Sequence, residues 1–379
     1  MMEILIKKEI LISALQSIHS VTDKSSVKPI LSNFLLKTLD DENGIDGKSC
    51  VEFSATDYEL SIIGKFPAQV IEHGSVCISA RKVYDICREF QGDDIFIKST
   101  EQLWIHVTSG ASQLKLPSID VGLYPQAVLE DLPEKVTTTA AELKHFIEST
   151  LFAAQTNESR RNLMGVCLSV LDEHTTRWLA TDGHRLAQMI GTVSSAISEK
   201  VSEVIIPRKA LQEVSKAVDL FKDSVEISFD DRTLQFVGST FTIKTRLIEG
   251  KFPNCDPIIP KDNDLNIVVD RDRLVSSLKI VSLISSEKLK PVKVTITQEK
   301  LILESEKAEY GEVSDEIEIE YSGEEFQIGF NAKYLLDVLN IINGSEIRLE
   351  FKNAMSPCLI KDPVDNSFLS VIMPLRIEW

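Results

Sequence analysis

The chain has 379 residues, of which 43% are hydrophobic and 26% are charged, and its formal net charge at pH 7 is −17. This composition is typical of a soluble globular protein of two or three domains, and the sequence lacks the roughly 18 to 20 consecutive apolar residues of a membrane-spanning helix. The negative charge excludes a protein that is basic throughout, but a locally basic face for nucleic acid remains open.

The apolar residues near the start of the chain recur with the period of a helix. Ile10, Leu11, Ala14, Leu15 and Ile18 would share one face, which predicts a helix over Glu9–His19. The same kind of pattern predicts helices over Ala141–Phe152 and Asp272–Leu283. Three more helices are expected to begin at short basic motifs: Arg81-Lys82, Arg208-Lys209 and Lys333.

Alternating or wholly apolar runs separated by turn residues predict that strands outnumber helices. Two hairpins are expected: Ser224–Phe229 with Leu234–Val237, and Val292–Thr297 with Leu301–Leu303. A last strand is expected at Leu369–Ile372. Exposed polar stretches are expected at Asp40–Lys48, Ser194–Val201 and Ser305–Glu316. The predicted fold class is therefore α+β, with antiparallel sheet covered on one face by helices.

The basic motifs mark a long repeat. Lys82, Lys209 and Lys333 follow one another at intervals of 127 and 124 residues. Two other segments keep this spacing: Ala55–Leu60 returns as Ala180–Leu186, and Leu123–Pro125 returns as Lys251–Pro253. A period this long is that of a whole domain rather than of a solenoid unit. We expect three similar domains over residues 1–127, 128–256 and 257–379, each with two helices packed on antiparallel sheet.

The repeated cations occupy an unusual position for basic residues. They stand in the first turn of a helix, where the helix dipole disfavours a cation by some 0.3 to 1 kcal/mol. At any one site, solvated surface residues would explain this. Recurrence in three equivalent places instead favours three phosphates bound in the same way, because a helix start flanked by lysine or arginine suits an anion.

Closed rotational symmetry would explain how these phosphate sites are arranged in space. Three sheet-bearing domains laid end to end leave one unpaired strand edge at each end of the chain. If the two edges are complementary, two chains can join head to tail and close a ring of six domains. With the basic helix ends turned inward, an acidic protein could surround a polyanion through salt-dependent contacts that do not depend on base sequence.

Several short blocks follow one another through the chain. They are Pro29–Asn33, Ala80–Arg88, Arg161–Gly165, Ala180–Leu186, Pro207–Lys209, Gly250–Pro253, Ser286–Lys288, Gly329–Tyr334 and Val371–Ile377. Together they resemble the bacterial sliding clamp family, the β subunit of the replicative DNA polymerase, from end to end. The resemblance implies a DNA-clamp fold that closes as a head-to-tail homodimer, with helices lining the hole. It also implies a non-catalytic processivity factor threaded on double-stranded DNA, without a cofactor.

The end of the chain is apolar almost to its last residue, which is unusual for a terminus. The resemblance implies that it lines a hydrophobic cleft for short peptides of the polymerase catalytic subunit, the clamp loader, and repair and translesion polymerases. The cleft residues implied are Leu163, Thr181, Gly183, His184, Arg185, Leu186, Pro253, Ile258, Leu289, Asn331, Tyr334, Met355, Pro357, Val371, Ile372, Met373, Pro374, Leu375 and Arg376. Cys255, Pro257 and Leu289 depart from the family pattern, so the peptide preference stays open.

Two further surfaces are implied. Contacts to DNA are expected from Lys24, Ser25, Arg81, Lys82, Arg160, Arg161, Arg208, Lys209 and Lys333. The dimer contact of the third domain is expected at Leu283 and Ile284, whereas its partner within Gly110–Leu123 stays unassigned. Glu378 and Trp379 extend past the usual end, where the indole could cap the cleft or lie on the surface.

Two rival hypotheses remain open at this level. One is an acidic peptide-binding scaffold that never encloses DNA. The other is a hydrolase built on Asp182, His184 and Arg185, with Ser159 or Cys167 as nucleophile. Asp182-Gly183 is a turn signal, and the matching first-repeat segment has no histidine, which favours a binding rim over catalysis.

The six cysteines carry no metal or disulfide signature, because they are scattered and form no C-x-x-C pair. We expect buried thiols at Cys50, Cys77, Cys87, Cys167, Cys255 and Cys358. Residues Met1–Lys8 lack the pattern of a secretory signal, so a cytoplasmic protein is expected.

Overall fold

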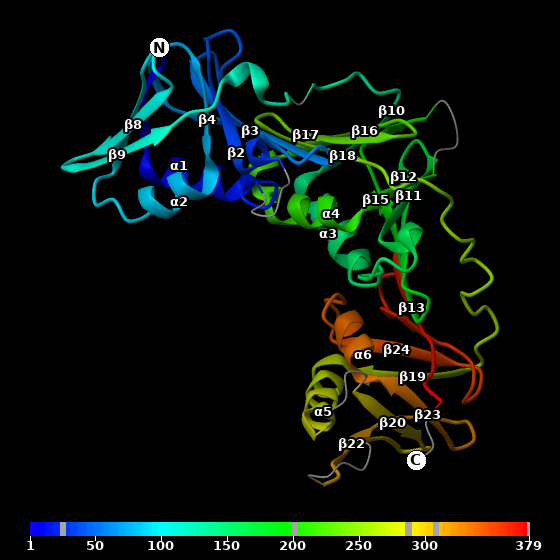
Figure 1. Ribbon diagram of the computed structural model, residues 1–379. Coiled ribbons are helices and arrows are strands. Elements are labelled where there is room, and N and C mark those ends of the chain that lie inside the picture. The colour runs from blue at the N-terminus through cyan, green and yellow to red at the C-terminus, as the bar shows by residue number, and fades with distance from the viewer. Residues whose placement is uncertain (23–27, 127, 199–202, 285–289, 306–310, 377–379) are drawn as a thin grey trace. The chain divides into compact units, whose positions relative to one another are not determined.

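The computed structural model describes residues 1–22, 28–126, 128–198, 203–284, 290–305 and 311–376 (Figure 1). Within them one succession of elements occurs three times: a strand, a helix, a run of strands, a second helix and three strands. The threefold repeat predicted from the basic motifs is therefore a repeat of structure. The exact boundaries at residues 127 and 256 remain a prediction.

The elements of each repeat have the following bounds. The first repeat comprises β1 (Glu3–Lys7), α1 (Lys8–Ile18), β2 (Asn33–Leu39), β3 (Cys50–Thr56), β4 (Leu60–Pro67), β5 (Gln69–Glu72), β6 (Ser75–Ser79), α2 (Ala80–Cys87), β7 (Asp94–Ser99), β8 (Trp104–Ser109) and β9 (Ser112–Pro117). The second comprises β10 (Glu134–Thr139), α3 (Ala140–Leu151), β11 (Gly165–Asp172), β12 (Thr175–Thr181), β13 (Arg185–Thr192), β14 (Ser195–Ile197), β15 (Glu203–Pro207), α4 (Arg208–Lys216), β16 (Ser224–Phe229), β17 (Thr233–Val237) and β18 (Phe241–Arg246). The third comprises β19 (Leu265–Asp270), α5 (Arg271–Ile284), β20 (Pro291–Ile296), β21 (Lys300–Ser305), β22 (Ser314–Glu318), β23 (Phe326–Asn331), α6 (Ala332–Leu339), β24 (Glu346–Phe351), β25 (Cys358–Lys361) and β26 (Phe368–Ile372).

The predicted helices and hairpins are confirmed. Helices α1, α3 and α5 lie within one residue of the ranges expected from apolar periodicity, and α2, α4 and α6 start at the basic motifs. Leu11, Ala14, Leu15 and Ile18 are the buried residues of α1, which is the face that the period indicated. Strands β16 and β17, and likewise β20 and β21, pair as the expected antiparallel hairpins.

Two of the stretches expected to be exposed contain strands. Ser194–Val201 includes the short strand β14, which pairs with β10, and Ser305–Glu316 includes the start of β22. Both are edge strands, and an edge strand can be polar because only one of its sides is hydrogen-bonded. The remaining stretch, Asp40–Lys48, is the expected polar loop between β2 and β3.

The described residues form two compact units. The first unit contains those of Met1–Lys144, Val193–Ser202 and Lys209–Leu247, and the second contains those of His145–Thr192, Glu203–Arg208 and Ile248–Trp379. This division differs from the sequence repeat because the two largest sheets each combine strands of two repeats. The central repeat contributes one of its sheets to each unit.

Every repeat provides two sheets, and neighbouring repeats share them edge to edge. In the first unit, the nine-stranded sheet β14-β10-β16-β17-β18-β4-β3-β2-β6 joins two repeats where β18 pairs with β4, and β5-β1-β7-β8-β9 stands alone. In the second unit, the eight-stranded sheet β15-β11-β12-β13-β26-β25-β24-β19 joins two repeats where β13 pairs with β26, and β22-β21-β20-β23 stands alone. All strand pairings in these sheets are antiparallel, as expected.

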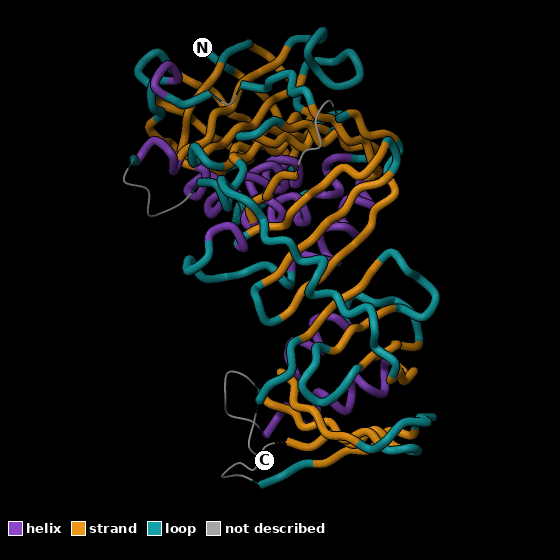
Figure 2. Tube along the Cα trace, turned by 90° about the vertical axis from the view of Figure 1, so that its right-hand side faces the viewer, coloured by secondary structure: helices purple, strands orange, loops and turns teal. Residues whose placement is uncertain are grey.

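Two pairs of helices pack on the sheets. Helix α1 contacts α2 and strands β3 and β4, whereas α2 contacts β2 and β6. In the third repeat, α5 contacts α6 and strands β20 to β22, and α6 contacts β23. Figure 2 shows helices, drawn in purple, lying against strands, drawn in orange. No helix among the described residues has both the length and the apolar character needed to cross a membrane.

All six cysteines are buried and free, which confirms the expectation of buried thiols. Burial raises the pKa of the Cys77 and Cys87 thiols to about 12. It also raises the pKa of the Cys167 and Cys358 thiols well above the usual range. The thiolate, which is the reactive form, is therefore disfavoured at each of these four positions.

Candidate functional sites

A tight turn between β12 and β13 organises the first candidate site. The Asp182 carboxylate accepts hydrogen bonds from the backbone N–H groups of His184 (2.9 Å) and Arg185 (3.0 Å), and the Thr181 hydroxyl donates to the Arg185 carbonyl (2.6 Å). Gly183 has a φ of +89°, and a Cβ there would lie 3.1 Å from the Arg160 guanidinium. Asp182 is therefore the structural residue that its turn signal indicated.

The side chain of Arg185 lies beneath this turn and connects two repeats. It is 9% exposed, and its guanidinium contacts Asp182 (3.1 Å) and Asp337 of α6 (2.6 Å). It also donates to the Phe152 carbonyl (2.6 Å), and its guanidinium carbon lies 4.3 Å from the ring centroid of Tyr334. The guanidinium is thus fully engaged, and Arg185 supports the surrounding surface rather than offering a free charge to a ligand.

The apolar end of the chain crosses the same region. After β26, the Met373 N–H donates to the His184 carbonyl (2.9 Å), and the Leu375 N–H donates to the Gly329 carbonyl of β23 (2.8 Å). Beneath it lies a buried apolar cluster of Leu163, Cys167, Leu179, Leu186, Ile205, Phe252, Cys255, Leu359 and Val371. The structure therefore brings the Thr181–Leu186 turn and the terminal residues together, as a peptide cleft requires.

The cleft residues expected from the sequence fall into three groups by exposure. Buried residues are Leu163, Thr181, Arg185, Leu186, Asn331, Val371 and Ile372. Half-buried residues are Tyr334, Pro357, Met373, Pro374 and Leu375, and exposed residues are Gly183, His184, Pro253, Ile258, Met355 and Arg376. The buried residues support the surface of the site. Asn331 also caps α6, because its side chain accepts a hydrogen bond from the Lys333 N–H (2.9 Å). Leu289, Glu378 and Trp379 lie outside the described residues.

The hydrolase hypothesis finds no support in this geometry. The carboxylate of Asp182 is occupied by two backbone donors and by Arg185, so it is not free to orient the His184 imidazole. Cys167 is 2% exposed and its thiol pKa is raised by burial. Within the described part of the chain, no group of three or more His, Cys, Asp or Glu side chains is placed to hold a metal ion.

The cations at the helix starts are not equivalent. Arg81, Lys82 and Lys333 are exposed, and Lys209 contacts Asp57 at 2.5 Å with 52% of its side chain exposed. Arg208 instead donates to the carbonyls of Leu151 (2.8 Å), the last residue of α3, and Ala154 (3.2 Å), in the turn after it. Burial lowers the pKa of the Arg208 guanidinium from its ordinary value. Arg208 thus satisfies two backbone acceptors, a role that the repeated motif did not reveal.

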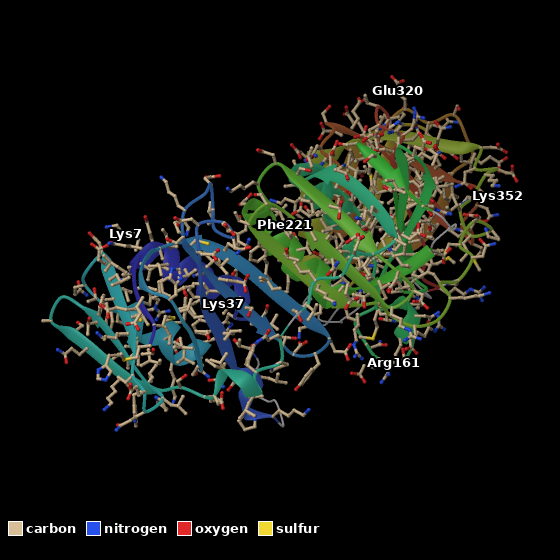
Figure 3. The ribbon with its side chains drawn as sticks, turned by 90° about the horizontal axis from the view of Figure 1, so that it is seen from above. Lys7, Lys37, Arg161, Phe221, Glu320 and Lys352 are labelled. Carbon is tan, nitrogen blue, oxygen red and sulfur yellow. The ribbon has the colours of Figure 1, made fainter. Side chains whose placement is uncertain are left out.

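The remaining predicted contacts are placed as follows. Arg160 and Arg161 are exposed, and the labelled Arg161 side chain projects from the ribbon in Figure 3. Leu283, at the end of α5, is 82% exposed, and Ile284 is half-buried. Lys24 and Ser25 lie outside the described residues.

Sequence reasoning missed Asp337, the partner of Arg185. It stands four residues after Lys333, a spacing that by itself indicates a pair along one helix rather than a contact with another repeat.

Solved structures that resemble the chain over its whole length include sliding clamps. The chain superposes on the β sliding clamp of C. crescentus, solved with PEG bound to its putative β-motif tethering region, with a TM-score of 0.91 and 31% identity over 99% of both chains. It also superposes on the DnaN sliding clamp of Bartonella birtlesii, solved with griselimycin, with a TM-score of 0.91 and 30% identity over 99% of this chain and 100% of that one. The molecule is therefore a three-domain α+β clamp protein.

The sequence defines the family. Models of the N-terminal, central and C-terminal domains of the DNA polymerase III beta subunit match residues 2–129, 137–254 and 256–376. The beta sliding clamp of Caulobacter vibrioides strain NA1000 is 31% identical over 382 residues, which cover 99% of this chain and 100% of the relative. The chain belongs to the DNA polymerase III beta subunit family, the beta sliding clamps. It is a non-catalytic processivity subunit, so the hydrolase hypothesis is wrong.

Proposed function

We propose that two copies of this chain close into a ring of six repeats around duplex DNA in the cytoplasm. The ring would slide without sequence preference and tether the polymerase catalytic subunit, the clamp loader, and repair and translesion polymerases through the peptide cleft. Membership of the sliding clamp family supports this function over that of an acidic scaffold that never encloses DNA.

The pattern of sheet joints supports ring closure most directly. In both joints within the chain, the last strand of one repeat pairs with the strand that follows the Thr-Asp turn of the preceding repeat: β18 with β4, and β26 with β13. By the same rule, β9, the last strand of the first repeat, should pair with β22, the equivalent strand of a third repeat. Both β9 and β22 are edge strands in this chain. A second copy, joined head to tail, would supply the missing partner for each.

The register of the existing joints carries over to the proposed one. Lys244 stands opposite Ser61 in the first joint, and Val371 stands opposite Leu186 in the second. Lys115 pairs with His106 in the ladder of β8 and β9, and Glu312 lies two residues before Ser314, where the ladder of β21 and β22 begins. Continuing the second ladder by those two residues makes Lys115 and Glu312 the equivalent residues of the proposed joint. The proposed joint therefore places an ammonium opposite a carboxylate, which favours this pairing.

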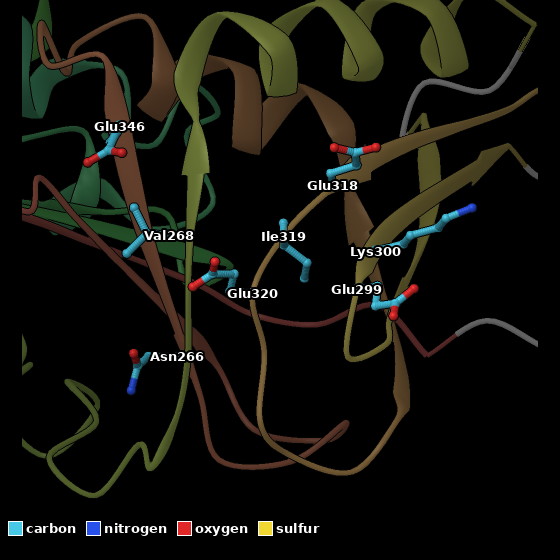
Figure 4. Close-up of a pocket in the computed structure, with 8 residues that line it drawn as sticks. All are labelled: Asn266, Val268, Glu299, Lys300, Glu318, Ile319, Glu320 and Glu346. Atoms are coloured by element: carbon cyan, nitrogen blue, oxygen red, sulfur yellow. The ribbon is translucent and has the colours of Figure 1, made fainter.

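The surroundings of the two edges are also complementary in charge. Lys115 is exposed on β9, with its ammonium 4.6 Å from the ring centroid of Trp104. Beside β22, the residues that line a hollow of about 740 Å³ include four glutamates, among them Glu318 and Glu320, and one lysine, Lys300 (Figure 4). Leu283 would contribute an exposed apolar contact, and Ile284 a half-buried one, at the end of the adjacent helix. Such an arrangement selects the head-to-tail partner, because opposite charges meet only in that orientation.

Contacts to DNA would come from cations at helix starts and on the loop before β11. We propose that Arg81, Lys82, Lys209, Lys333, Arg160 and Arg161 meet backbone phosphates, and that Lys24 and Ser25 join them. Arg208 would act mainly by holding the end of α3, since its guanidinium is engaged there.

A charge exchange tests ring closure. Sedimentation of the purified chain at micromolar concentration should show a dimer, and Lys115→Glu should weaken dimerisation by about tenfold or more because two carboxylates then face each other. Combining it with Glu312→Lys should restore much of the affinity. Lys352→Glu, the same charge reversal at an exposed residue that belongs to neither β9 nor β22, is the matched control. A wild-type monomer, or a double variant no better than Lys115→Glu, would rule out this joint.

A further inference from the structure

The outer edge of β19 is unpaired in the third repeat, whereas the equivalent edge is occupied in the other two. In the first repeat β5 pairs with the outer edge of β1, and in the second repeat β14 pairs with that of β10. Strand β19 ends the eight-stranded sheet, and among the described residues no strand pairs with its other side. The third repeat therefore lacks one strand that the first two have.

The hydrogen bonds after the first strand of each repeat show which residues are equivalent. The N–H of the residue that follows this strand donates to the chain on the inner side of the sheet, and these donors are Lys8, Ala140 and Arg271. Three residues before each of them stand Leu5, Thr137 and Val268. Leu5 lies opposite Gln69 of β5 and Thr137 lies opposite Ser195 of β14. Val268, at the same position, is left 39% exposed.

The backbone groups of β19 that face this open edge can be assigned. The Arg271 N–H donates to the Ser345 carbonyl (2.8 Å), on the side of β24. Backbone groups alternate in direction along an antiparallel strand, so those of Val269 also face β24, and those of Asn266 and Val268 face the open edge. An edge with outward N–H and C=O groups is a template for a further strand.

The hollow of about 740 Å³ described above lies beside this edge, and all of its lining residues belong to one compact unit (Figure 4). Asn266 and Val268 line it from β19, and Ile319 lines it from the segment after β22. In the first two repeats the equivalent segment supplies β5 or β14. In the third, the N–H groups of Ile319 and Tyr321 donate instead to the turn between β20 and β21, at 2.9 and 3.1 Å. The chain's own segment is thus held away from the edge.

Acidic side chains dominate the lining of the hollow. Its four glutamates are Glu299, Glu318, Glu320 and Glu346, and within the described part of the chain none of them forms an ion pair. The single lysine of the lining, Lys300, is paired with Glu316 at 2.6 Å. Arg348 stands opposite Val268 on β24 but does not line the hollow. The charge therefore favours an occupant with cationic side chains.

The proposed ring closure leaves this edge free. Strand β22 would pair with a second copy, whereas β19 belongs to the other sheet of the unit. In the first joint, β4 pairs with β18 while the next strand, β5, pairs with β1. The two kinds of pairing thus coexist within one repeat.

We propose that the open edge of β19 docks an extended basic segment of a partner protein, which pairs with β19 in place of the missing strand. Asn266 and Val268 would exchange main-chain hydrogen bonds with this segment, and its alternate cationic side chains would meet the glutamates of the hollow. The site shares no residue with the predicted peptide cleft. A partner could therefore engage the chain at both places, which would raise its overall affinity.

The test uses the full chain and a fluorescein-labelled heptapeptide of alternating lysine and valine. Fluorescence anisotropy should show binding to the wild type and at least about tenfold weaker binding to Val268→Pro and to Glu346→Lys. Proline removes the outward N–H but spares the bonds to β24, which come from the neighbouring residues. Glu173→Lys, the same charge reversal at an exposed residue that does not line the hollow, is the matched control and should bind like the wild type.

A second measurement separates strand pairing from simple charge attraction. Two versions of the peptide, N-methylated at the lysine or at the valine amides, keep all the charges. One version should bind at least about tenfold more weakly, because an added strand is hydrogen-bonded along only one of its sides. This comparison uses the wild-type chain, so it holds even if Val268→Pro fails to fold.

Four outcomes would overturn the proposal. They are no binding to the wild type up to millimolar peptide, equal binding of a peptide with glutamate in place of lysine, undiminished binding to a folded Val268→Pro or to Glu346→Lys, and equal binding of both methylated peptides and the unmodified one. A wild-type chain that sediments as a monomer would contradict ring closure instead, and it would leave this proposal standing because the edge belongs to one chain.

Discussion

At the scale of single residues, similar basic side chains have different structural roles. Lys82 and Lys333 extend into solvent from the first turns of α2 and α6. Arg208 begins α4 at the equivalent motif, yet it is half-buried and donates to the carbonyls of Leu151, the last residue of α3, and of Ala154 in the turn that follows. The guanidinium of Arg208 is half-buried and binds two acceptors at once, whereas Arg81 at the start of α2 is exposed, so the position of the arginine decides its role.

This difference predicts separable effects on DNA binding and on stability. Lys82→Ala should reduce the slope of log Kd against log salt by about 1, because one phosphate contact is lost. Arg208→Ala should leave that slope nearly unchanged and lower the free energy of unfolding by about 1 to 3 kcal/mol, because two carbonyls lose their donor. Salt titrations of DNA binding and urea unfolding measure the two quantities. Equal changes in slope would show that Arg208 also meets phosphate.

At the scale of elements, an ion pair fastens α5 to the edge strand β22. Arg273 of α5 donates to both carboxylate oxygens of Asp315, at 2.7 and 2.8 Å, and also to the hydroxyl of Ser277. The hydrogen bonds from Arg273 hold the pKa of the Asp315 carboxyl at about 2, well below its usual range. Because β22 is the edge proposed to meet a second copy, this pair also sets the position of that edge.

The stability from this pair should depend on pH in a defined direction. A carboxyl whose pKa is lowered by folding contributes stability above its unfolded pKa of about 4, and that contribution is lost as the pH falls to about 2. Asp315→Asn should therefore cost about 1 to 2 kcal/mol at pH 7, reduced for the partial exposure of Arg273, and almost nothing near pH 2. Urea unfolding of both proteins across this range is the measurement. A pH-independent difference would contradict the role of the pair.

The elements themselves could be predicted from the sequence, but their pairing could not. Apolar periodicity located α1, α3 and α5, and the basic motifs located α2, α4 and α6, because both signals are local. The joint between β18 and β4 is formed by residues about 180 positions apart, such as Ile243 and Ile62, and no local pattern specifies it.

The structure corrects the alignment of the sequence repeats at one position. Leu60 is equivalent to Arg185 rather than to Leu186. The Leu60 carbonyl accepts from the Thr56 hydroxyl, just as the Arg185 carbonyl accepts from the Thr181 hydroxyl.

The candidate sites, like the fold, could be predicted from the sequence only in part. Motif resemblance brought together the Thr181–Leu186 turn and the terminal residues, and the structure places them in contact. It did not distinguish residues on the surface from those that support it, such as Arg185 and Asn331. That distinction depends on partners such as Asp337, which are distant in sequence and are known only once the fold is known.

At the scale of the whole molecule, a strong negative charge coexists with a proposed task on DNA. Acidic residues outnumber basic ones in each third of the chain, so the mean field repels the polyanion. Enclosure would resolve this conflict, because a closed ring needs only weak local contacts to remain on the duplex. Weak contacts to backbone phosphate would also permit sliding.

Enclosure predicts a dependence on DNA topology rather than on affinity alone. The chain loaded onto a nicked circular plasmid should stay bound through gel filtration and should be lost once the plasmid is cut, since a ring can slide off a free end. Lys115→Glu should be lost from both forms because its rings open. Equal retention on circular and linear DNA would instead indicate ordinary binding and would favour the acidic scaffold.

The rule that pairs β18 with β4 and β26 with β13 leaves one joint of a different kind. Those two joints are tethered by the polypeptide, so after a transient separation their edges remain at an effective concentration of about millimolar or above. The proposed joint between β9 and β22 has no such tether. A ring of two chains would contain two untethered joints, and opening either would leave the other to hold both subunits together. The same strand pairing would thus form two kinds of joint. The joints within a chain would stay closed and those between chains could open, and only the connectivity of the chain distinguishes them.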